Sequence, residues 1–152
     1  MTVFGGIPVV VAVPILLLLT STMGFYVATA FGVTRYLARH FGWQQWWLFP
    51  FARGAVETMR TYGPVGGFPW GNAGYSLTTV PILLQGASLA GVYGLVFAIG
   101  LVNSVLAELI VAWRTKQPLP KTPLMVLGGV CLLWLAWGGF RLASEPDDLP
   151  TI

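Results

Sequence analysis

Three long apolar segments divide the chain, and short polar or glycine- and proline-rich stretches separate them. The segments run from residue 7 to 31, from 83 to 113 and from 124 to 140. A helix needs about 20 apolar residues to cross about 30 Å of hydrocarbon, so each segment is predicted to span a membrane. The second segment is longer than a perpendicular crossing requires. This length predicts either a tilted helix or a turn near Gln85 and Gly86.

A fourth segment, from Trp43 to Arg60, has a mixed pattern of apolar and charged residues. Three tryptophans cluster near its start, as side chains at a membrane interface do. Arg53, Glu57 and Arg60 follow at positions i, i+4 and i+7, so they share one helical face. The segment is therefore either an amphipathic helix on the membrane surface or a crossing helix whose charged face is buried against its neighbours.

Basic residues decide between these alternatives, because lysine and arginine concentrate in cytoplasmic connections. One cluster follows the first span and another lies between the last two spans: Arg35, Arg39 and His40, then Arg114, Lys116 and Lys121. If both clusters are cytoplasmic, the chain must leave and return between them, so segment 43–60 is predicted to cross. We expect an all-α membrane protein, a bundle of about four transmembrane helices with both termini outside. A transmembrane domain over 1–143 would precede a short extracytoplasmic tail, 144–152.

Small residues four positions apart predict close helix contacts. Ala87 with Gly91, and Ala90 with Gly94, are such pairs. The stretch before them, 63–81, is rich in glycine, proline and aromatic residues and is expected to form an extracytoplasmic loop. By composition alone, this loop is either an aromatic interface anchor or a lipid-binding site.

Composition excludes most soluble functions. Hydrophobic residues make up 56% of the chain and charged residues 9%, whereas soluble domains carry about 25% charged residues. The net charge of +3 does not gather into a basic patch, so no nucleic-acid partner is expected. Cys131 lies within an apolar span and is predicted to be a packed, unreactive side chain. With one cysteine and one histidine, we expect no metal site, no cofactor and no catalytic residue.

Polar side chains at membrane depth form the first part of the candidate site. Ionisable groups are costly there, so the charged face of segment 43–60 is either a structural ion pair or faces a substrate. Aromatic loop residues form the second part. The full set of candidate substrate- or lipid-binding residues is Arg53, Glu57, Arg60, Phe68, Pro69, Trp70 and Tyr75.

Several of these residues occur in motifs that resemble one enzyme family. The chain contains Glu57-x-x-Arg60, then the run GFPWGNAGYS over 67–76, then GVYG over 91–94, and then Asn103. Occurring in this order, these motifs are similar to those of the apolipoprotein N-acyltransferases. The resemblance implies a bacterial inner-membrane protein whose membrane helices precede a large extracytoplasmic nitrilase-like domain.

The resemblance implies that, in this family, a catalytic set of Glu, Lys and Cys in the nitrilase-like domain moves an acyl chain from a phospholipid to a lipoprotein. The acyl chain passes through a cysteine thioester to the free amino group of the lipoprotein. The present sequence stops at Ile152, about where that domain would begin. We therefore expect a fragment, a split-gene product or a truncated paralogue that is inactive by itself and meets lipoprotein through a separately encoded domain. The alternative is a small membrane assembly partner or transporter subunit with no acyl-transfer role.

Overall fold

The computed structural model describes residues 6, 8–63 and 71–144, and every regular element in these residues is helical. The prediction of an all-α protein is confirmed for this part of the chain. In chain order the elements are α1 (Val9–Phe41), α2 (Gln45–Tyr62), the 3-10 helix η1 (Ala73–Leu77), α3 (Pro81–Leu84), α4 (Ala87–Thr115) and α5 (Lys121–Ala143). By length and apolarity, α1, α4 and α5 can each cross a membrane, which confirms the three predicted spans in number.

Two of these helices extend beyond the apolar segments that predicted them. Helix α1 continues to Phe41 rather than ending near residue 31, and Gly42 closes it with a positive φ of 70°. Helix α5 likewise runs from Lys121 to Ala143 rather than from 124 to 140. Hydropathy marks only the apolar part of a helix, whereas backbone hydrogen bonding continues through the polar turns at its ends.

The second apolar segment is not one continuous helix. The single turn α3 ends at Leu84, and Gln85 and Gly86 form a turn before α4, which is one of the two alternatives that the sequence left open. A second break follows inside α4 at Ala90 and Gly91, and Gly91 has φ 62° and ψ −167°. Only glycine adopts such angles readily. No neighbouring heavy atom lies within 4 Å of a Cβ atom built at Gly91, so the prediction of close helix packing at this residue is wrong.

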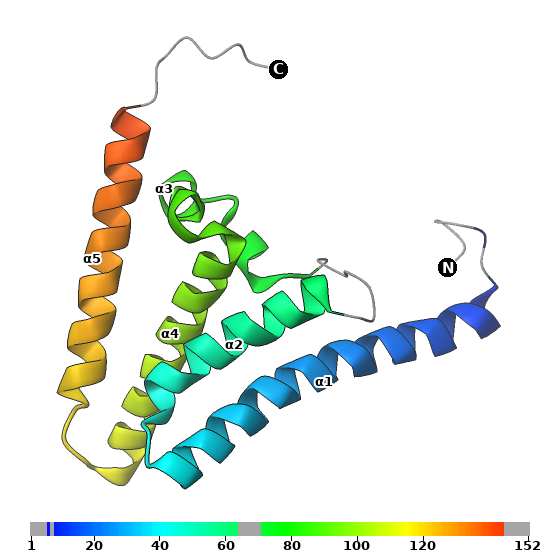
Figure 1. Ribbon diagram of the computed structural model, residues 1–152, viewed down its shortest axis with the longest axis horizontal. Coiled ribbons are helices and arrows are strands. Elements are labelled where there is room, and N and C mark those ends of the chain that lie inside the picture. The colour runs from blue at the N-terminus through cyan, green and yellow to red at the C-terminus, as the bar shows by residue number, and fades with distance from the viewer. Residues whose placement is uncertain (1–5, 7, 64–70, 145–152) are drawn as a thin grey trace.

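The best-packed part of the structure lies between α2 and α4 (Figure 1). Trp46, Leu101 and Val105 form its buried apolar cluster. A Cβ atom added at Gly100 would lie 3.1 Å from the Cα atom of Pro50, so the two backbones approach closely at that point. Helix α2 also packs along the second half of α1, where Ala30 is fully buried.

Helix α5 is fastened to the rest of the molecule through α3 and the beginning of α4. Trp134 Nε1 donates a hydrogen bond to the carbonyl oxygen of Leu83 at 2.9 Å, and Trp137 Nε1 donates to Ser88 Oγ at 3.0 Å. Gly138 packs directly on α3, because a Cβ there would lie 2.1 Å from the carbonyl oxygen of Ile82. Glycine thus sets the distance between α3 and α5.

Large apolar side chains are exposed along most of α1 and α5. Leu18 on α1 is 71% exposed and Leu133 on α5 is 75% exposed, which suits surfaces that face lipid. Cys131 lies on this exposed surface of α5, so the prediction that it is packed is wrong. Each of these helices contacts its neighbours on one side and along only part of its length, so most of its apolar surface stays exposed.

A buried charge cluster between α1 and α2

The charged face of α2 forms a compact cluster of three side chains. Arg53 Nη1 and Arg60 Nη2 each lie 2.5 Å from one of the two carboxylate oxygens of Glu57. Glu57 is 1% exposed and Arg60 6% exposed. We call Arg53, Glu57 and Arg60 the charge cluster.

Helical geometry explains why these residues meet. Side chains three and four positions apart are neighbours on a helix, so one carboxylate reaches one arginine on each side. Among the described residues, two guanidinium groups contact one carboxylate, so this part of the chain carries an excess of positive charge at the cluster. Removing such ions from water costs several kcal/mol for each ion, even after the protein relaxes. The cluster is therefore a costly feature whose excess charge suits an anionic group.

A cavity of about 360 Å³ adjoins the charge cluster and lies between α1 and α2. Thr20, Met23 and Tyr26 line it from α1, and Arg60 Nη1 lies 3.0 Å from the Met23 sulfur. Gly71, after the end of α2, also lines this cavity. We call it the cluster cavity, and its walls combine apolar groups with the charged groups of the cluster.

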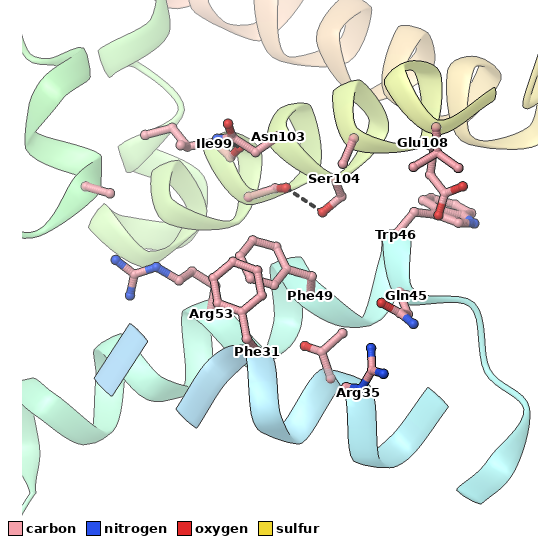
Figure 2. Close-up of a pocket in the computed structure, with 15 residues that line it drawn as sticks. Phe31, Arg35, Gln45, Trp46, Phe49, Arg53, Ile99, Asn103, Ser104 and Glu108 are labelled. Carbon is pink, nitrogen blue, oxygen red and sulfur yellow. Dashed lines mark hydrogen bonds between the residues drawn. The ribbon is translucent and has the colours of Figure 1, made fainter. Parts of the chain in front are cut away.

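A larger cavity of about 780 Å³ lies between α1, α2 and α4, and we call it the central cavity. Arg53 lines both cavities, so the charge cluster borders both. Figure 2 shows Arg53 at one end of the central cavity, with Phe31 and Phe49 next to it. Glu108 lies at the opposite end.

Two polar residues of α4 that line the central cavity are bonded within their own helix. Ser104 Oγ donates to the carbonyl oxygen of Gly100 at 2.7 Å, and Asn103 Nδ2 donates to that of Ile99 at 2.8 Å. The single hydroxyl proton of Ser104 is therefore used within α4 and does not link helices. Among the described residues, no group of three histidine, cysteine or acidic side chains could hold a metal ion.

The loop after α2 is described only from Gly71 onward, so the candidate residues Phe68, Pro69 and Trp70 lie outside the described residues. Asn72 Oδ1 accepts a hydrogen bond from the Gly74 backbone at 2.8 Å and so caps η1. A Cβ at Gly74 would lie 2.8 Å from the backbone oxygen of Val92, so this glycine lets η1 pack on α4.

The structure thus brings together three of the four candidate residues that it describes. Tyr75 lies in η1, is 48% exposed and lines neither the cluster cavity nor the central cavity. Sequence reasoning missed Met23 and Tyr26, which form the opposite wall of the cluster cavity. No hydropathy signal could have found them, because α1 is apolar around most of its circumference.

Comparison with known proteins identifies the family. Residues 1–105 match the model of the apolipoprotein N-acyltransferase N-terminal domain. The apolipoprotein N-acyltransferase of Geobacter metallireducens is 35% identical over 154 residues, which is 98% of this chain and 29% of that protein. That of Haemophilus ducreyi is 38% identical over 148 residues, covering 95% of this chain and 25% of the relative.

That of Aquifex aeolicus is 38% identical over 80 residues, covering 53% of this chain. No solved structure matches the chain. The chain spans less than a third of the length of these relatives, and its match lies in the family's N-terminal domain. The chain therefore belongs to the apolipoprotein N-acyltransferase family, of which it carries the N-terminal membrane domain.

Proposed function

We propose that this chain is the membrane-embedded part of a bacterial inner-membrane enzyme that transfers an acyl chain from a phospholipid to the N-terminus of a lipoprotein. Its role is to hold phospholipid, or the acyl chains of the lipoprotein, beside the reacting groups. The observation that carries this proposal is the charge cluster, which places excess positive charge next to two partly apolar cavities.

The chemistry of phospholipids fits this arrangement. Guanidinium groups bind phosphate through paired hydrogen bonds, and they do so better than lysine where the site is partly buried. An acyl chain needs an apolar wall next to the phosphate, and side chains of α1 supply one in the cluster cavity, among them Leu19 and Val27. Phe68, Pro69, Trp70 and Tyr75 are proposed to complete the lipid site from the loop that follows α2.

A chimeric enzyme tests this function. This chain would replace the matching segment of the Geobacter metallireducens relative, and the chimera would be expressed where it is the sole N-acyltransferase. We expect mass spectrometry to find the additional acyl chain on the N-terminus of a reporter lipoprotein. A chimera that inserts and folds but never acylates the reporter would favour the alternative, a membrane partner without an acyl-transfer role.

We also propose that α2 crosses the membrane, as a fourth span, and that both termini are extracytoplasmic. Helix α2 has 18 residues, which corresponds to about 27 Å. It is not among the three helices that are apolar enough to cross by composition, because it carries the charge cluster. Glu57 and Arg60 of this cluster are buried, so they would not face lipid in a crossing helix. The α1–α2 and α4–α5 connections lie at the same end of the molecule (Figure 1), which supports a common side for both basic clusters.

Cysteine labelling tests this topology. In a Cys131→Ser background, single cysteines would replace Gln44, before α2, and Thr79, after η1. If α2 crosses, a membrane-impermeant maleimide added to cells should label the Thr79→Cys protein, and should label the Gln44→Cys protein only after permeabilisation. Equal labelling of both proteins in intact cells would place α2 on the membrane surface and contradict four crossings.

A further inference from the structure

A third cavity lies at the end of the molecule opposite η1, where the α1–α2 and α4–α5 connections meet. We call this end the basic end. The cavity has a volume of about 570 Å³, and Arg39 of α1 and Lys121 of α5 both line it. Neither side chain forms an ion pair within the part of the chain that the structure describes. The cavity thus brings together two cations that are distant in sequence and contains no member of the charge cluster.

The other groups that line this basic-end cavity complete an interfacial site. Trp43 provides an indole ring of the kind that anchors proteins at the headgroup level, and Gln44 and Thr122 provide polar groups. Glu108 is the one carboxylate among the described residues that line it. Two cations therefore face a single acidic group, and the cavity carries excess positive charge.

The basic-end cavity adjoins the central cavity, because Gln45, Trp46 and Glu108 line both. Beyond these shared residues, Phe31 and Phe49 give the central cavity an apolar wall, and Arg35 and Arg53 also line it (Figure 2). A cationic, polar cavity thus lies beside a partly apolar one. This sequence of environments matches an anionic headgroup joined to an acyl chain.

We infer that these two cavities hold one anionic phospholipid of the leaflet at the basic end. Its phosphate lies between Arg39 and Lys121, and one acyl chain enters the central cavity beside Phe31 and Phe49. Basic pockets between transmembrane helices are the sites at which anionic headgroups bind membrane proteins. This lipid is distinct from the acyl donor proposed at the charge cluster, because the residues that hold its headgroup lie at the other end of α2.

The position of the site suggests what the lipid does. Hydrogen bonds from Trp134 and Trp137 hold the far end of α5. At the basic end, where Lys121 begins α5, Leu124 and Leu127 pack against the buried cluster of α2 and α4. A phosphate bound by Arg39 and Lys121 joins α1 to α5, two helices with no extensive direct contact in the described residues. The lipid therefore links α1 to α5 at the basic end of the bundle.

Lipid binding to the purified chain tests the inference. The chain in uncharged detergent would be titrated with phosphatidylglycerol or phosphatidylcholine, and native mass spectrometry would count bound lipid. We expect one tightly held phosphatidylglycerol and no comparable phosphatidylcholine. The double variant Arg39→Gln/Lys121→Gln should bind phosphatidylglycerol at least about tenfold more weakly, because each cation contributes about 1 kcal/mol near an anionic headgroup.

The matched control is Arg114→Gln/Lys116→Asn, which removes the same charge from the same end but from residues that line none of the three cavities. It should bind phosphatidylglycerol within about twofold of the unmodified chain. Equal loss in both double variants, or undiminished binding in Arg39→Gln/Lys121→Gln, would overturn the inference. So would equal binding of phosphatidylcholine, or displacement of phosphatidylglycerol by an equal concentration of inorganic phosphate.

Folding of each variant would be checked by helical circular dichroism in phosphatidylcholine. If Arg39→Gln/Lys121→Gln does not fold, Lys121→Gln replaces it, since Lys121 is exposed at the start of α5. This single variant should still lose about fivefold in affinity for phosphatidylglycerol, and unchanged affinity would overturn the inference. None of these outcomes depends on acyl transfer.

Discussion

Replacing Glu57 with leucine is expected to destabilise the folded chain by about 3–5 kcal/mol, because it leaves two arginines facing each other without the carboxylate that joins them. Arg60 is buried, so bulk water solvates its charge poorly once the carboxylate is removed. Unfolding of the purified chain, followed by tryptophan fluorescence as the fraction of denaturing detergent rises, measures the loss. The midpoint should fall far below that of the unmodified chain.

Two further variants show whether the loss comes from unpaired charge. Glu108→Gln removes the other acidic group of the described residues, which is only half-buried, and should cost less than about 1 kcal/mol. The triple variant Arg53→Leu/Glu57→Leu/Arg60→Leu should be more stable than Glu57→Leu, because a fully apolar replacement leaves no buried charge. A triple variant as unstable as Glu57→Leu would show that packing, and not charge, determines the effect.

Gly138→Ala should detach α5 from α3, at a cost of about 1–3 kcal/mol for overpacking a close contact. The added Cβ atom would lie 2.1 Å from the carbonyl oxygen of Ile82, and a backbone atom has no rotamer through which to move away. The hydrogen bond from Trp134 to Leu83 depends on the same approach of the two helices. The unfolding midpoint and the fluorescence maximum of the tryptophans should both change.

The adjacent glycine supplies the control. A Cβ atom at Gly139 would meet no heavy atom within 4 Å, so Gly139→Ala changes the helix by the same methyl group without a collision. In a helix interior, alanine is favoured over glycine by about 1 kcal/mol, so this variant should be as stable as the unmodified chain or more stable. Equal destabilisation by both substitutions would contradict the close packing of α5 on α3.

Hydropathy predicted the membrane spans because lipid imposes a strict requirement of length and apolarity on a crossing helix. Helical spacing predicted the charge cluster, because positions i, i+4 and i+7 share a helical face whatever surrounds the helix. The break at Gly91 could not be predicted, since a glycine at a small-residue spacing fits helix packing as well as a change in backbone direction. The structure resolves this ambiguity through the angles of Gly91.

The walls of the cavities were also beyond prediction from the sequence. Helix α1 carries no charged residue before Arg35, so no periodic signal shows that Met23 and Tyr26 face the charge cluster. Arg39 and Lys121 were assigned to the same side of the membrane by charge alone. That they line one cavity follows from the arrangement of α1, α2 and α5, which depends on packing between helices rather than on the pattern within each helix.

The most direct test of the central claim is acyl transfer by the chimeric enzyme carrying Arg53→Leu/Glu57→Leu/Arg60→Leu. This variant removes the charge cluster while sparing the buried-charge penalty of Glu57→Leu. If the cluster holds substrate, the chimera should insert and fold, yet mass spectrometry should find the reporter lipoprotein without its additional acyl chain. If the same folded chimera acylates the reporter as fully as the unmodified one, the cluster is a structural ion pair and its proposed substrate role is wrong.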